Sequence, residues 1–487
     1  MNMLSYSFIL FFPIVTIVYF LLPFRYRKFW LLVSNYYFYI QSGFPITFLI
    51  IATLITYIGG YIIGKIDKHK KAMFLIFMAM NLSLLIFFKY FDFLLLNFNS
   101  LLNYLNISNS INLQFNLIIP FGLSFYIFQS CTYLGDVYRG KIDIEKNFVK
   151  YALFVSFFPC IASGPIQKSR DLIHQFDLKV NFEYERVKKG LLLITYGFFV
   201  KLIVANNLAS IVNLVFSDYA NYSGLCCLIA AVCFSFQIYC DFSSYSDIAI
   251  GTAKVLGFEL KSNFNRPYLS TNLAMFWKNW HMTLNSWFVE YVYIPLGGNR
   301  KGNIRKYINI LVVFFLSGLW HGASWHFVLW GVINGLMQIF GEITKNLKSK
   351  LYKFIGIKES LPFIRGIKII TTFVLVTITW VFFRMASVMA SIDFIKKMIF
   401  DNSFNLMNEQ VLNMFGNNIY YVLLLVVSVG MFLLVQVLRS KSSSFEKFNK
   451  LPRIMKNIVY SFLVIVISFS LMSSNSKVNT SFIYFEF

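Results

Sequence analysis

Long apolar stretches follow one another along nearly the whole chain, and no other feature of the sequence constrains the fold as much. A helix needs about 20 apolar residues to cross a membrane. The stretches therefore predict an all-α polytopic membrane protein with about 11 transmembrane helices, together with shorter or re-entrant ones. They cover residues 1–24, 29–64 (two spans), 72–105, 117–138, 150–166, 190–216, 222–250, 307–343, 367–383, 419–438 and 457–473.

Composition excludes the soluble alternatives. Hydrophobic residues make up 57% of the 487 residues and charged residues only 13%. That charged share is about half of what soluble domains carry, and one water-soluble core cannot hold so much apolar side chain. The same numbers exclude a disordered chain. No soluble domain interrupts the apolar stretches, so we expect one membrane domain, 1–487, with 474–487 as an extracytoplasmic tail.

The net charge is strongly basic, with 44 Lys and Arg against 21 Asp and Glu, or +23. These charges lie in short loops between apolar stretches, which is the positive-inside pattern and indicates membrane lipids, not nucleic acid, as the partner. Both chain termini are predicted to lie outside the cytoplasm. The loops expected in the cytoplasm are 65–71, 139–150, 168–189, 299–306, 345–353 and 439–456, and those expected outside are 99–116 and 401–418.

Polar residues gather in a few segments that interrupt the apolar pattern, namely 239–247, 263–270, 276–300 and 317–330. Asp241 lies at membrane depth, where a carboxylate costs several kcal/mol unless it is paired or hydrated. We expect its side chain to face a polar interior. A role in holding helices together is the alternative to a functional one.

His321 is the residue best placed for chemistry. It lies inside an apolar stretch, and Gly318 and Gly322 flank it, which permits close backbone approach or a broken helix. Trp320 and Trp325 provide apolar walls. A buried imidazole stays neutral and can accept a proton from a hydroxyl, as a general base does. A structural histidine is the alternative.

A metal centre is not expected at this histidine. His326 lies nearby in the sequence, but no carboxylate or cysteine stands at ligand spacing around the pair. We read His326 as structural or tunnel-lining, and His69 and His174 as solvated. No cofactor is predicted.

These segments together resemble the membrane-bound O-acyltransferase family, and most closely its bacterial alginate O-acetyltransferase membrane-subunit branch. The resemblance covers roughly residues 1–400 and also includes 120–129, 136–140, 163–165 and 380–384. It implies a ring of tilted helices around a central tunnel or funnel. It also implies that His321, in the motif Trp-His-Gly, is catalytic and that His281 is a second catalytic histidine. Asn334 departs from the pattern, since many relatives carry histidine there.

The remaining assignments also rest on the resemblance. Trp277, Trp320 and Trp325 would line the tunnel, with Asp241 and Asn285 beside the substrate. The enzyme would sit in the bacterial cell membrane and move an acyl group, expected to be acetyl from cytosolic acetyl-CoA, to an extracytoplasmic polysaccharide or cell-wall glycan. A separate exterior acyltransferase or esterase-like protein is the expected partner. The alternatives are D-alanyl transfer to teichoic acid and a transporter or flippase without chemistry.

The last residues, Phe-Ile-Tyr-Phe-Glu-Phe, carry one more candidate. They resemble the C-terminal motif of the small membrane peptide that acts in teichoic-acid D-alanylation. The resemblance implies that Tyr484 carries the acyl group between two enzymes as a phenyl ester. An aromatic interfacial anchor is the alternative, because aromatic residues favour the membrane surface.

Overall fold

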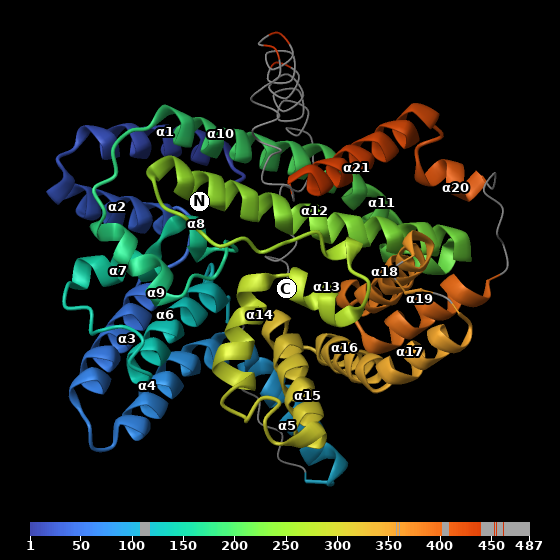
Figure 1. The fold of residues 1–487 in the computed structure, drawn as a ribbon, viewed down its shortest axis with the longest axis horizontal. Coiled ribbons are helices and arrows are strands. Elements are labelled where there is room, and N and C mark those ends of the chain that lie inside the picture. Colours follow the sequence, from blue (N-terminus) through green and yellow to red (C-terminus); the bar gives the residue numbers. More distant parts are fainter. Residues whose placement is uncertain are drawn as a thin grey trace. The chain divides into compact units, whose positions relative to one another are not determined.

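The computed structural model describes residues 1–107, 117–356, 358–359, 361–401 and 409–439, and the single residues 452, 454 and 461. Within these residues the protein is entirely helical (Figure 1). The chain forms two compact units. The first unit comprises Met1–Ile194 and Tyr245–Lys261, and the second comprises Thr195–Ser244 and Ser262–Phe487.

The first unit is built around α6, in which every residue except Ser124 and Tyr138 is buried. Helix α3 packs against α4 and α6, and α2 packs against α7. The Tyr151 hydroxyl donates to Thr56 Oγ1 at 2.6 Å, so buried polar groups also tie these helices together. The elements are α1 (Tyr6–Leu21), α2 (Phe24–Ile40), α3 (Thr47–Lys65), α4 (Lys70–Leu85), η1 (Ile86–Tyr90), α5 (Phe91–Tyr104), α6 (Leu123–Tyr138), α7 (Phe148–Ser156), α8 (Phe158–Ile161), α9 (Ser169–Leu172), η2 (Ile173–Asp177), and parts of α10 (Tyr184–Phe199) and α12 (Gly224–Leu256).

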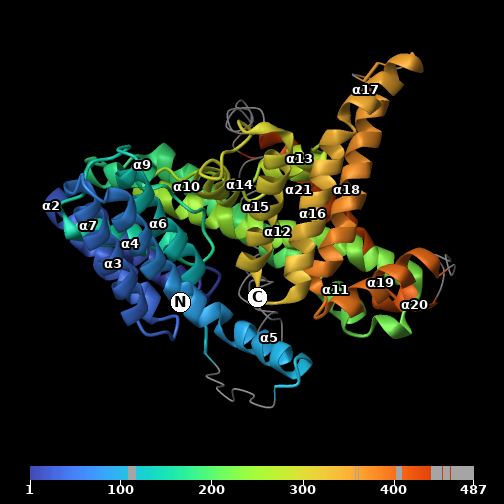
Figure 2. The ribbon, with the colours of Figure 1, turned by 90° about the horizontal axis from the view of Figure 1, so that it is seen from below.

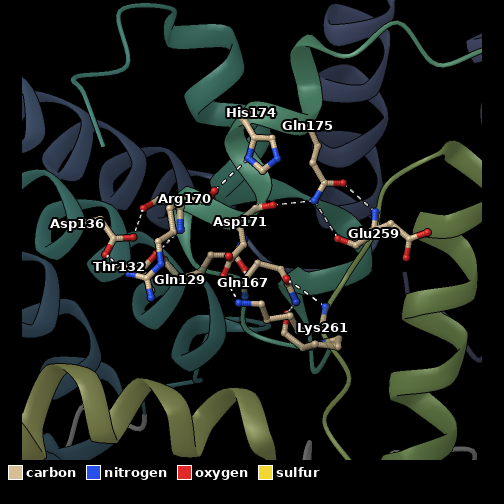
Figure 3. Close-up of polar contacts among 12 residues, drawn as sticks. Gln129, Thr132, Asp136, Gln167, Arg170, Asp171, His174, Gln175, Glu259 and Lys261 are labelled. Carbon is tan, nitrogen blue, oxygen red and sulfur yellow. Dashed lines mark hydrogen bonds and ion pairs between the residues drawn. The ribbon is translucent and has the colours of Figure 1, made fainter. Parts of the chain in front are cut away.

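A polar network fixes the loops of this unit (Figure 3). The fully buried carboxylate of Asp136 accepts hydrogen bonds from Ser169 Oγ at 2.8 Å and from Arg170 Nη1 at 2.9 Å. Gln167 Oε1 accepts the backbone N–H of Lys261 at 3.3 Å. The buried carboxylate of Asp136 and the side-chain oxygen of Gln167 thus each have a donor, as buried acceptors in native structures usually do. The bond from Lys261 also holds the segment after α12 against the segment before α9.

Three helices of the second unit lie side by side. Helix α16 lies between α15 and α18 and contacts both (Figure 2). The elements are η3 (Val200–Ala205), α11 (Asn206–Ser217), η4 (Tyr219–Asn221), η5 (Pro267–Leu269), α13 (Leu273–Asn279), α14 (Met282–Phe288), η6 (Val289–Tyr293), α15 (Gly302–His321), α16 (Trp325–Ile343), α17 (Lys345–Phe354), α18 (Pro362–Arg384), α19 (Val388–Phe400), α20 (Glu409–Met414), α21 (Ile419–Arg439), and the remaining parts of α10 and α12.

The described residues contain six helices long and apolar enough to cross a membrane, or seven if the bent pair α16 and α17 forms one span. The protein is therefore a multi-pass membrane protein, but this part of it holds fewer spans than the 11 or so that the apolar stretches predict. Two of the predicted apolar stretches form shorter helices that are not among these candidates. Residues 117–138 form the buried helix α6, and 150–166 form the short helices α7 and α8. Their apolar side chains contact protein. The last predicted span, 457–473, lies almost entirely outside the described residues.

Candidate active site

His321 is the last residue of α15, at the tip of a tight helical hairpin. Gly322 after it is extended, and α16 starts three residues later at Trp325. The two helices approach closely: a Cβ on Gly318 would lie 2.3 Å from the carbonyl oxygen of Phe327. No side chain fits at that distance, so glycine is required for this contact. Both readings of the glycines, close approach and a broken helix, are therefore confirmed.

Aromatic rings surround the imidazole of His321, whose residue is only 6% exposed. The ring centroid lies 5.0 Å from that of Trp320, 5.2 Å from that of Trp330 and 5.0 Å from that of Phe383. Phe383 comes from α18, so three helices contribute to this surrounding. Such walls exclude bulk water from the imidazole.

His281 occupies the turn between α13 and α14 with an unusual backbone conformation. Its φ is 41°, in the left-handed region that few side chains adopt. Its Nδ1 lies 3.3 Å from the Asn263 side-chain oxygen, which also accepts the Thr283 hydroxyl at 2.6 Å. A carbonyl oxygen can only accept, so this contact favours the proton on Nδ1 and the lone pair on Nε2.

The protonation of His281 follows from its burial. The residue is 3% exposed and lies outside the candidate membrane spans. Burial lowers the pKa of His281 to about 3, so its imidazole is neutral across the physiological range.

Trp320 brings the two histidines together. The centroid of its indole lies 5.0 Å from the His321 ring and 5.8 Å from the His281 ring. The sequence places the histidines in different segments, and the structure shows both against one side chain. Such a pair, enclosed by aromatic rings, can bind a hydroxyl and accept its proton.

The structure places the other residues singled out in the sequence as follows. Trp277 contacts Trp330, with ring centroids 5.5 Å apart, and its carbonyl oxygen accepts Asn285 Nδ2 at 3.1 Å. Trp325, the first residue of α16, is 57% exposed. Tyr484 lies outside the described residues.

Asp241 meets a partner that sequence reasoning missed. Its carboxylate lies 2.5 Å from the ammonium nitrogen of Lys201, and both side chains are almost fully buried. Lys201 belongs to the π-helical turn η3, which joins α10 to α11. A lysine inside the apolar stretch 190–216 was the available signal, since an intramembrane charge requires a partner.

The other histidines take the places expected of them. His326 Nδ1 lies 3.0 Å from the backbone oxygen of Phe382, so this ring joins α16 to α18. His69 and His174 are exposed. Sequence reasoning assigned no role to Asn263, Trp330 or Phe383, and only their contacts with the two histidines reveal one.

Comparison with known proteins places these residues in a family context. The profile of the membrane-bound O-acyltransferase family matches residues 144–388, which include both histidines. A protein of Pseudomonas putida named probable alginate O-acetylase is 34% identical over 77% of this chain and 75% of its own length. The peptidoglycan O-acetyltransferase of Helicobacter pylori is 31% identical over 76% of this chain and 73% of its own length. The teichoic acid D-alanyltransferase of Bacillus subtilis is 28% identical over 46% of this chain and 59% of its own length.

Proposed function

Because the chain belongs to the membrane-bound O-acyltransferase family, we propose that it moves an acetyl group from cytosolic acetyl-CoA across the membrane for transfer to a glycan outside. Relatives named for acetyl transfer to alginate and to peptidoglycan support both the acetyl donor and the glycan acceptor. Membership of an acyltransferase family also sets aside a transporter without chemistry. The observation that carries the catalytic assignment is the contact of two buried histidines with one indole, that of Trp320.

In this proposal His321 is the general base. A hydroxyl oxygen adds to the thioester carbon while the imidazole of His321 takes the hydroxyl proton. The tetrahedral intermediate then collapses, the carbon–sulfur bond breaks, and the sulfur leaves with the electron pair. The imidazolium returns its proton to the thiolate, so the products are an oxygen ester and free CoA.

His281 acts beside the base as a second neutral imidazole. Its bond to Asn263 keeps the Nδ1 proton in place and leaves the Nε2 lone pair for a hydroxyl or a water molecule. We propose that His281 orients the attacking hydroxyl.

Trp277, Trp320 and Trp325 would line the path of the acyl group, with Asp241 and Asn285 near it. Only this group has to cross, since CoA is too polar and too large to pass through lipid.

The first acceptor in this scheme is the phenol of Tyr484, and the final acceptor is the glycan. A phenyl ester is more activated than an alkyl ester, so a separate exterior transferase can take the acetyl group onward. D-alanyl transfer is the second candidate, supported by the similarity to the teichoic acid D-alanyltransferase. It differs in its donor, which would be a carrier-protein thioester.

Incubating the purified protein with [14C]acetyl-CoA tests the proposal. The wild type should release CoA and bind label covalently. His321→Ala should lower this turnover by about 10²–10⁴-fold, the usual contribution of a general base. His69→Ala is the matched control, since it removes an exposed histidine. Undiminished turnover in His321→Ala would contradict the assignment, and turnover of a D-alanyl carrier protein alone would favour the second candidate.

A further inference from the structure

Two buried indole N–H groups, one on a ring that contacts His321 and one on the ring next to it, have no hydrogen-bond acceptor among the residues that the structure describes. They belong to Trp330 on α16 and Trp277 on α13, and both nitrogen atoms are shielded from solvent. A buried donor without an acceptor costs free energy, and native structures contain few. Such a group calls for an explanation, and a ligand acceptor is one.

The two indoles lie where the chemistry takes place. The Trp330 ring is 5.2 Å from the His321 ring, at an interplanar angle of 89°. The Trp277 ring lies 5.5 Å from Trp330, at 84°. The base, one donor ring and the second donor ring therefore form a continuous contact series, and Trp330 itself is 1% exposed.

Local contacts hold both rings in place. The Trp277 ring packs edge-on against Phe314, with centroids 5.7 Å apart and planes at 76°. Trp330 stacks on Trp380, with centroids 5.7 Å apart and planes at 16°. Preorganised donors of this kind are the ones that stabilise developing charge most effectively.

Trp380 shows that a neighbouring indole in the same cluster is satisfied by the protein. Its Nε1 donates to the Tyr268 hydroxyl at 3.2 Å, and that hydroxyl donates to the Ser235 carbonyl oxygen at 2.5 Å. Burial in this aromatic cluster thus does not by itself leave an indole N–H without an acceptor. Trp330, which contacts the His321 ring, and Trp277, which contacts Trp330, differ from Trp380 in this respect.

We propose that the indole N–H groups of Trp330 and Trp277 donate hydrogen bonds to the carbonyl oxygen of the acyl thioester. When the hydroxyl adds to the carbonyl carbon, the carbon–oxygen π electrons move onto this oxygen, and the two donors stabilise the negative charge. The charge returns to form the carbonyl again as the carbon–sulfur bond breaks. This inference rests on the proposed acyl transfer and adds two groups that contact the reacting atoms.

The sharpest test replaces the indole N–H and keeps the ring. Benzothienylalanine carries sulfur in place of the N–H and can be incorporated at position 330 of the full-length protein by nonsense suppression. With [14C]acetyl-CoA, kcat should fall by about 10²–10³-fold while KM stays close to the wild-type value, as for the loss of one oxyanion donor. The same replacement at position 277 should act in the same direction. At position 380 it is the matched control, because that N–H bonds to Tyr268.

A second readout does not depend on turnover. In the His321→Ala protein, bound [1-13C]acetyl-CoA should show a carbonyl stretch at lower frequency than in water, and the replacement at 330 should reverse this shift. An unchanged kcat and carbonyl frequency at 330, in a wild-type background that turns over acetyl-CoA, would overturn the oxyanion role and leave the proposed function standing. A wild-type protein that neither binds nor turns over acetyl-CoA would overturn both.

Discussion

In the second unit, buried charged side chains depend on the partners that lie beside them. The Lys201–Asp241 pair is the clearest case, because both groups are buried and 2.5 Å apart. Removing one member of a buried pair leaves an uncompensated charge, whereas replacing both with apolar residues of similar volume is often neutral or stabilising. The pair therefore fixes how η3 meets α12.

We expect Asp241→Leu or Lys201→Met alone to destabilise the protein by about 3–5 kcal/mol, and the double variant to recover most of that loss. Thermal unfolding in detergent measures both effects. The exposed pair Lys254–Glu259 is the matched control, since exposed pairs contribute about 0–1 kcal/mol. A double variant no more stable than the singles would contradict the pairing.

Tyr484 supports a separate prediction at this scale. Tyr484→Phe keeps the aromatic ring and removes only the hydroxyl, so a carrier role predicts that glycan acetylation falls to background. Label from [14C]acetyl-CoA should also vanish from the C-terminal peptide. Tyr104→Phe, which removes an exposed phenol from α5, is the control. Full acetylation in Tyr484→Phe would return the tail to the role of an interfacial anchor.

Among the elements, the hairpin of α15 and α16 positions His321. Gly318→Ala places a Cβ 2.3 Å from the Phe327 carbonyl oxygen, so the helices must separate. Overpacking of this kind costs about 1–3 kcal/mol, and here it also shifts the base three residues further along α15. Acyl transfer should fall more than expression does.

Gly341→Ala is the control for this prediction. A Cβ at Gly341, on the other helix of the hairpin, α16, would meet nothing within 4 Å. Alanine favours a helix over glycine by about 1 kcal/mol, so this variant should be at least as stable as the wild type and fully active. Equal turnover of acetyl-CoA by the Gly318 and Gly341 variants would refute the role of the hairpin.

The elements also show what could be predicted from sequence. The glycines around His321 indicated the helix end correctly, because that signal is local. The pairing of Lys201 with Asp241 and of His281 with Asn263 depends on tertiary contacts that no spacing encodes. The apolar stretches of α6 and α7 predict spans, but both helices are too short to be among the candidate spans. Residues buried against protein and residues facing lipid have the same hydropathy, so the sequence does not distinguish them.

At the scale of the whole molecule, the sequence predicts a single membrane domain and its orientation in the membrane. The orientation can be tested on one long helix. The helix from Lys70 to Tyr104 has 35 residues, or about 52 Å, which exceeds the ~30 Å hydrocarbon core. As a candidate span, it is expected to place its two ends on opposite sides of the bilayer. Charge bias predicts that the Lys70 end lies in the cytoplasm.

Cysteine labelling with an impermeant reagent tests this orientation. Tyr104→Cys, at a position that is 84% exposed, should react in intact cells, and Lys68→Cys should react only after permeabilisation. The native cysteines make a suitable background because all but Cys233 are buried. The reverse labelling pattern would invert the topology and place the C-terminal tail inside the cell.

The end of α15 at His321 has one more consequence. Peptide dipoles along a helix sum to a partial negative charge at its C-terminus, where the last carbonyl groups are unsatisfied. If His321 acts as the proposed base, this partial charge favours the transferred proton by about 0.3–1 kcal/mol without any acidic side chain. In the proposed mechanism, this partial charge would assist His321 while it holds the proton of the attacking hydroxyl.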